Sequence, residues 1–124
     1  MNSQNIKPTY ILRFFFDYKA GGCLWSGNDA AYEKYGVGPL DATIYNLKGK
    51  ISHEPKIKLP DVVKQNVLEL DDLYSESLNW DDPAGNSPWS EEEWDDFYKR
   101  ARSLHEEISK TLGDDFEVIY EQQK

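Results

Sequence analysis

The sequence has little of what enzymes use for covalent or metal chemistry. Its 124 residues include one cysteine, Cys23, and two histidines, His53 and His105. A single cysteine cannot close a disulfide within the chain, and no Cys/His cluster has the spacing of a zinc site. The sequence therefore predicts neither a disulfide framework nor a metal centre, and we expect no cofactor.

Long hydrophobic runs are also missing. No apolar stretch approaches the roughly 20 residues that cross a bilayer, and residues 1–5 have neither the basic region nor the apolar run of a signal peptide. We therefore expect a cytoplasmic protein that does not bind membranes. The length fits one domain over residues 1–124, with residues 1–8 as a loose tail.

Basic residues are scarce in the second half of the chain, and the net charge is -9. Residues 1–58 hold eight Lys/Arg and five Asp/Glu, a net +3, whereas residues 59–124 hold six and eighteen, a net -12. An acidic field of this size repels nucleic acid and attracts basic protein surfaces. Because acidic surfaces also favour solubility in general, charge alone does not identify a partner.

Aromatic residues are abundant, at 14% of the chain, so the mean hydropathy of -0.76 does not indicate disorder. Residues 9–18 alternate so that one face is wholly apolar or aromatic, which predicts an inner strand. The paired glycines Gly21 and Gly22 predict a turn into a short strand at 23–26. Alternation also predicts a closing strand at 116–121.

Two long amphipathic helices are predicted, at about 60–78 and 91–112. Their apolar stripes, spaced by three and four residues, are Val63, Val67, Leu70, Tyr74 and Leu78 in the first helix and Trp94, Phe97, Ala101, Leu104, Ile108 and Leu112 in the second. Ser90 and Glu93 have the spacing of a capping box, and Trp89 and Trp94 that of a hydrophobic staple.

These elements predict an α+β fold, in which the two long helices pack on a small antiparallel sheet of strands near 9–18, 23–26 and 116–121. A short helix is expected at 28–35. Residues 38–58 have two interpretations, an inserted hairpin or an ordered loop. In the hairpin interpretation, residues 43–47 pair with residues 50–53.

Catalysis receives little support from the sequence. Cys23 could pair in space with His53 or His105, but its neighbours Leu24 and Trp25 predict a buried, inert thiol. The four Asp-Asp pairs lack an EF-hand loop. Neighbouring carboxylates on a helix point about 100° apart and do not converge as an acid–base pair. We therefore assign no catalytic residues.

The segment 79–96 is the strongest candidate for a binding surface, because it has three tryptophans and seven carboxylates and no basic residue. Helix initiation explains Trp89, Ser90, Glu93 and Trp94. The predicted partner-binding residues are those that helix initiation explains less well: Trp80, Asp81, Asp82, Glu91, Glu92, Asp95 and Asp96. An aromatic anchor among steering carboxylates is typical of an interface with a cationic protein.

Several short blocks carry a resemblance to known proteins: residues 12–18 (LRFFFDY), 22–26 (GCLWS), 28–30 (NDA), 77–80 (SLNW) and 88–94 (PWSEEEW). They resemble a group of small bacterial proteins without established catalytic residues. More loosely, the chain is similar to immunity proteins of polymorphic-toxin and contact-dependent growth inhibition systems. That resemblance implies a small, acidic, cytoplasmic protein that binds a cognate toxin domain, frequently a basic nuclease. Residues 41–58 depart from the pattern and look like an insertion.

The leading hypothesis is therefore an immunity protein that neutralises a toxin by binding it. The alternatives are a cysteine-dependent enzyme that uses Cys23 and a housekeeping interaction protein unrelated to toxins.

Overall fold

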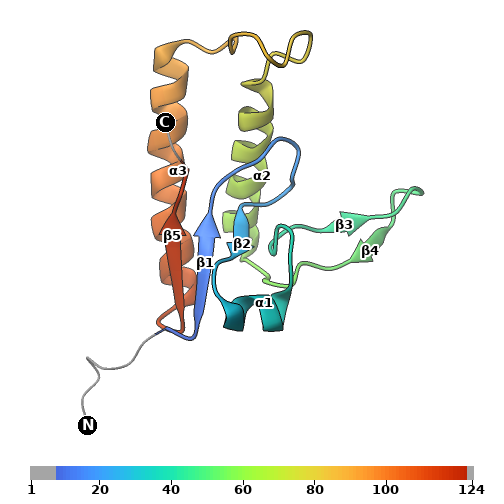
Figure 1. The fold of residues 1–124 in the computed structure, drawn as a ribbon, viewed down its shortest axis with the longest axis vertical. Coiled ribbons are helices and arrows are strands. Elements are labelled where there is room, and N and C mark those ends of the chain that lie inside the picture. The colour runs from blue at the N-terminus through green and yellow to red at the C-terminus, as the bar shows by residue number, and fades with distance from the viewer. Residues whose placement is uncertain (1–7, 123–124) are drawn as a thin grey trace.

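The computed structural model describes residues 8–122, so most of the tail expected at 1–8 lies outside the described residues. The elements follow in the order β1 (Tyr10–Phe14), β2 (Leu24–Ser26), α1 (Asp29–Tyr35), β3 (Ile44–Tyr45), β4 (Ile51–His53), α2 (Asp61–Glu76), α3 (Glu91–Leu112) and β5 (Phe116–Tyr120) (Figure 1). This is the α+β fold expected from the sequence.

The main sheet has the strand order β2-β1-β5, with β1 in the middle. β2 is antiparallel to β1, but β5 is parallel to it. The expectation of a wholly antiparallel sheet is therefore wrong for β5. The cause is the helix pair: α2 and α3 run in opposite directions, so the chain leaves α3 at the end of the molecule where β1 begins and turns back along β1 (Figure 1).

β1 is shorter than the strand expected at 9–18. Its ladder with β5 closes at Phe14, whose carbonyl accepts a hydrogen bond from the Glu121 amide at 2.9 Å. The Phe16 amide donates instead to the side chain of Gln122, at 2.6 Å. Because a side chain replaces the partner strand there, residues 15–18 leave the sheet and form the first part of the loop to β2.

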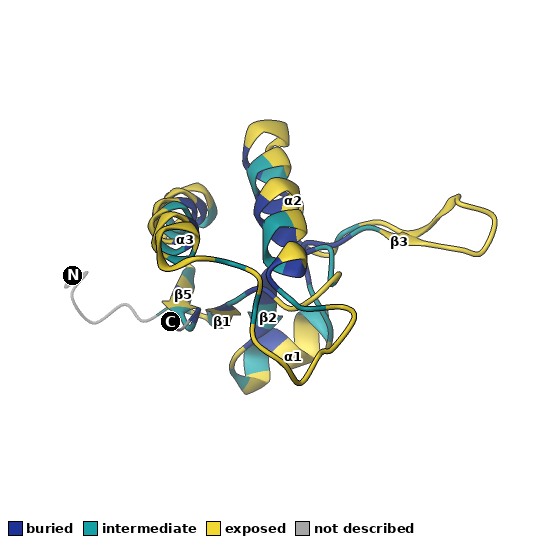
Figure 2. Cartoon of the chain, turned by 90° about the horizontal axis from the view of Figure 1, so that it is seen from above, coloured by how far each residue is buried: buried dark blue, intermediate teal, exposed yellow. Residues whose placement is uncertain are grey.

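The core lies between the sheet and the two long helices, which cover one of its faces (Figures 1 and 2). Both predicted apolar stripes pack in it or against it, except Leu78, which lies beyond the end of α2 at Glu76 and is not part of the core cluster. The buried residues of these elements are Leu12 and Phe14 of β1, Val63, Val67 and Leu70 of α2, Phe97, Ala101, Leu104 and Ile108 of α3, and Val118 of β5.

Helix α3 begins as the sequence predicts. The Ser90 side chain accepts from the Glu93 amide at 3.2 Å, and the Glu93 carboxylate accepts from the Ser90 amide at 3.0 Å, which completes the capping box. The rings of Trp89 and Trp94 meet edge to face with centroids 4.7 Å apart. Gly113 follows the last turn with a φ of 83°, a conformation that favours glycine.

Strands β3 and β4 pair with each other as a second, two-stranded antiparallel sheet. They form a hairpin that projects sideways from the body of the molecule (Figures 1 and 2). Of the two interpretations left open for residues 38–58, the structure has the hairpin. That the hairpin is an insertion stays a prediction.

Candidate functional site

The seven predicted binding residues lie in the loop between α2 and α3 and in the first two turns of α3, at one end of the molecule (Figure 1). All seven are exposed. We call them the tryptophan–acid surface: Trp80, Asp81, Asp82, Glu91, Glu92, Asp95 and Asp96.

Trp80 is held in place although half of its surface, 51%, is exposed. Its indole N–H donates to the carbonyl of Ser75 at 2.8 Å. Its ring meets Tyr18 edge to face at 6.2 Å, and the Lys19 ammonium lies 4.6 Å from the ring centroid. A fixed, exposed indole loses little entropy when a partner covers it, which suits an anchor residue.

The acidic tip of the loop has a defined backbone. The Asp82 amide donates to the carbonyl of Asn79 at 3.1 Å, and the Gly85 amide donates to the carbonyl of Asp82 at 2.8 Å. The Ser87 hydroxyl donates to the carbonyl of Ser77 and closes the base of the loop. The carboxylates of Asp81 and Asp82 are therefore presented on an ordered turn.

The three tryptophans do not form one cluster. Trp89 and Trp94 pack against each other and Phe97, at the edge of the core, whereas Trp80 packs against Tyr18 beyond the end of α2. The structure thus supports the division made from the sequence, in which helix initiation accounts for Trp89 and Trp94 but not for Trp80.

A groove beside Trp80 adds acidic residues that the sequence analysis did not select. It has a volume of about 560 Å³ and is lined by Lys19, Gly21, Leu68, Asp71, Asp72, Ser75, Glu76 and Trp80. Leu68, Asp72 and Glu76 follow each other at a spacing of four residues on α2 and are exposed. That spacing in the sequence could have predicted an acidic face on this helix. It could not have predicted the groove, because the loop residues Lys19 and Gly21, some 50 positions away, complete it.

Asp71 lies at the floor of this groove and is only 5% exposed. Its Oδ2 accepts from the Gly21 amide at 3.2 Å, while its Oδ1 is buried without a hydrogen-bond partner among the described residues. Loss of solvent raises the pKa of this carboxyl to about 6, and the negative charge of Asp72 adds to the shift.

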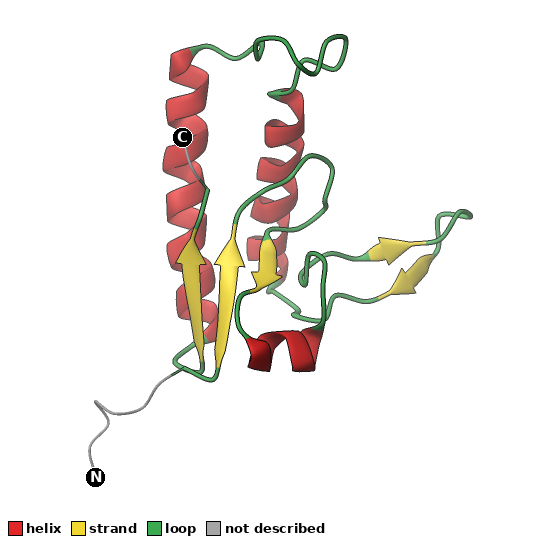
Figure 3. Cartoon of the chain, viewed as in Figure 1, coloured by secondary structure: helices red, strands yellow, loops and turns green. Residues whose placement is uncertain are grey.

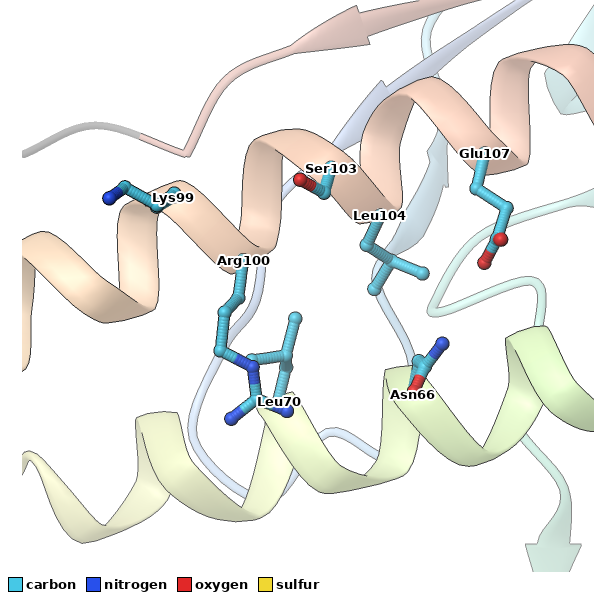
Figure 4. Close-up of a pocket in the computed structure, with 7 residues that line it drawn as sticks. All are labelled: Asn66, Leu70, Lys99, Arg100, Ser103, Leu104 and Glu107. Carbon is cyan, nitrogen blue, oxygen red and sulfur yellow. The ribbon is translucent and has the colours of Figure 1, made fainter.

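A second groove, of about 350 Å³, runs between the two long helices (Figure 4). Leu70 of α2 and Leu104 of α3 point into it, and Arg100 lies across it and pairs with Glu69. Its rim has both signs of charge, from Lys99, Arg100 and Glu107. It contains none of the predicted binding residues.

The surroundings of Cys23 do not favour a cysteine nucleophile. The thiol is fully buried, and burial, followed by the nearby charge of Asp41, raises its pKa well above the usual range. His53 is exposed on the hairpin, and the His105 ring bonds to the Val118 carbonyl at 2.6 Å. A catalytic cysteine needs a lowered pKa and access to substrate, and Cys23 has neither.

Two further searches cover the described residues alone. Across residues 8–122, no three His, Cys, Asp or Glu side chains gather as a possible metal site. In the same range, no helix combines the length and the apolar character needed to cross a membrane.

Comparison with known proteins identifies the family. No curated protein matches the chain, but a family model described as Serratia CdiI immunity protein-like matches residues 30–123. The match includes the projecting hairpin, both long helices, β5 and the whole tryptophan–acid surface. It covers well over half of the chain. The chain therefore belongs to the Serratia CdiI immunity protein-like family, whose members are immunity proteins of contact-dependent inhibition systems.

Proposed function

We propose that this protein neutralises its cognate toxin domain by binding it directly through the tryptophan–acid surface, and that the toxin domain is a basic nuclease. The protein would act in the cytoplasm, as an inhibitor without catalysis of its own. The observation that carries the proposal is the pairing of a fixed, half-exposed Trp80 with exposed carboxylates on an ordered loop, in a chain of an immunity-protein family.

The two kinds of residue have different roles in this proposal. Exposed carboxylates at the rim of an interface mainly accelerate the encounter with a cationic partner, and salt screens their effect. A buried aromatic anchor mainly slows dissociation. Asp81 and Asp82 are therefore expected to steer the toxin, while the indole of Trp80 becomes covered in the complex.

The test uses the double variant Asp81→Asn/Asp82→Asn and the cognate toxin domain. We expect the association rate at low ionic strength to fall by about tenfold, since electrostatic steering contributes factors of roughly 10 to 1,000. The dependence of the rate on salt should become flatter. Stopped-flow tryptophan fluorescence measures both quantities.

The matched control is Asp114→Asn/Glu117→Gln, which removes the same charge from exposed positions at the opposite end of α3 and in β5. This control should associate at nearly the wild-type rate if location matters more than net charge. A wild-type rate and salt slope in Asp81→Asn/Asp82→Asn would show that the contact surface lies elsewhere. Rescue of growth from the toxin without any detectable complex would contradict direct binding.

A further inference from the structure

The projecting β3–β4 hairpin has no role in the core. Every residue from Ile44 to Glu54 is exposed, and Figure 2 shows the hairpin extending away from the helices and the main sheet. A two-stranded hairpin by itself is at best marginally stable in water. Its persistence as a projecting arm therefore depends on its own turn and on its attachment to the body.

The attachment is unusually firm. Asp41, at the root, is fully buried, and its carboxylate accepts from the amides of Cys23 and Leu24, each at 3.0 Å. The Lys64 ammonium donates to the Asp41 carbonyl. On the returning strand, the Ile57 amide donates to the Leu40 carbonyl at 2.9 Å. The two ends of the arm are thus tied to β2, to α2 and to each other.

The turn of the hairpin is also fixed. The Asn46 side chain accepts from the amides of Lys48 and Lys50, at 2.9 and 3.1 Å. The Asn46 amide donates to the carbonyl of Lys50 at 2.8 Å. An arm fixed at both root and turn loses little entropy when it docks.

Apolar side chains cover this arm. Leu47 at the tip is as exposed as in an extended chain, and Ile44, Tyr45 and Ile51 are each more than half exposed. Large apolar side chains gathered on one projecting element mark an interaction site, because leaving them in water gains nothing for the fold.

The positive charge of the arm favours a partner with an acidic surface. Residues 43–58 contain four lysines and one glutamate, a net +3, in a chain whose total is -9. This basic arm would repel a basic toxin, and it would also repel the hairpin of a second copy of this chain. A surface of opposite charge is on the chain itself: the exposed α2 face of Leu68, Asp72 and Glu76 has an apolar side chain beside two carboxylates.

We propose that the β3–β4 hairpin is a self-association arm, which docks on the α2 face of a second copy of this chain. Lys48 and Lys50 meet Asp72 and Glu76 of the second copy, and Leu47 packs on its Leu68. In a closed two-fold pair each contact occurs twice, so a modest single contact is doubled. The contact involves two copies of this protein alone, and only the exclusion of a basic toxin as the partner of the arm rests on the proposed function.

Sedimentation velocity of the purified full chain across the micromolar range tests this. The wild type should form a dimer whose dissociation constant rises with salt. Lys48→Glu/Lys50→Glu should raise that constant by at least about tenfold, an amount well within what two charge contacts supply. Lys99→Glu/Lys110→Glu, the same charge change at exposed positions of α3, is the matched control and should dimerise far better than the hairpin variant.

A charge swap makes the test specific. Asp72→Lys/Glu76→Lys alone should also be monomeric, and mixing it with Lys48→Glu/Lys50→Glu should restore a heterodimer. All four positions are exposed, so circular dichroism should show folded variants. A wild type that stays monomeric, or a hairpin variant that dimerises normally, overturns the proposal. A monomeric wild type together with a hairpin variant that loses its toxin complex would assign the arm to the toxin instead.

Discussion

Two buried carboxylates, Asp41 and Asp71, are accommodated in different ways. Asp41 accepts from two backbone amides, and a Cβ at Gly22 would lie only 2.5 Å from its Oδ1, so that glycine leaves the space the carboxylate occupies. Asp71 accepts from one amide and has a buried oxygen without a partner among the described residues. Neither was singled out from the sequence, because both sites are completed by residues far away in the chain.

The raised pKa of Asp71 has a consequence for stability. Its native value of about 6 lies above the ordinary 3.8, so the native state holds this proton more tightly than the unfolded state does. The resulting stabilisation is complete below pH 3.8 and is lost as the pH rises through about 6. Replacing the carboxyl by an amide removes the titration and keeps an oxygen for the Gly21 amide.

We therefore predict that Asp71→Asn gains stability relative to the wild type between pH 4 and pH 7. The gain should be on the order of 1–3 kcal/mol, since one pKa unit corresponds to about 1.4 kcal/mol. Urea unfolding of both proteins at each pH measures it, and taking the difference cancels the titration of the other acids. A difference that does not change with pH would mean that Asp71 titrates normally in the native protein.

At the scale of elements, helix α3 was predicted nearly residue by residue, and the direction of β5 was not. The signals that begin α3 lie close together in the sequence, between Trp89 and Trp94, and the structure has all of them. The pairing of β5 with β1 joins segments about 100 residues apart. The alternation of apolar and polar residues is the same whether β5 runs parallel or antiparallel to β1. Only the path of the chain through the two long helices decides the direction of β5.

The capping box gives a prediction at this scale. Ser90→Ala leaves the Glu93 amide without its side-chain acceptor, and such losses cost about 0.5–2 kcal/mol. We expect a loss of about 1 kcal/mol, measured as a lower urea midpoint with an unchanged slope. Ser90→Asp, which retains a capping oxygen and suits the helix dipole, should recover most of it. An equal loss in both variants would indicate that the hydroxyl acts through something other than the cap.

The same contrast holds for the candidate site. The tryptophan–acid surface could be found because its residues lie close together in the sequence and exceed what helix initiation requires. The α2 face of Leu68, Asp72 and Glu76 was missed, since it becomes a groove only where the loop carrying Lys19 and Gly21 packs beside it. Tertiary structure brings these segments together, and no local pattern encodes that.

At the scale of the whole molecule, charge is separated along the chain and in space. The hairpin, whose sequence contains lysines, projects from one side of the molecule (Figures 1 and 2). Most of the acidic residues belong to α2, the following loop and α3. The α2 face proposed for contact between copies lines the same groove as Trp80, so self-association and the proposed toxin binding would use neighbouring acidic residues. The cost of this arrangement is repulsion among the acids within each folded chain.

That repulsion predicts how salt acts on stability. At pH 7 the chain carries -9, and compaction brings like charges together, so raising NaCl from low ionic strength to physiological values should stabilise the native state. We expect a gain on the order of 1 kcal/mol, the scale of a few screened surface pairs.

Near the sequence pI of about 4.6 the net charge vanishes, and the gain should shrink or reverse because attractive pairs such as Arg13–Glu121 are screened as well. Urea midpoints by tryptophan fluorescence, at sub-micromolar protein to avoid association, measure the effect. An equal gain at both pH values would point to a general salt effect on apolar burial rather than to charge repulsion.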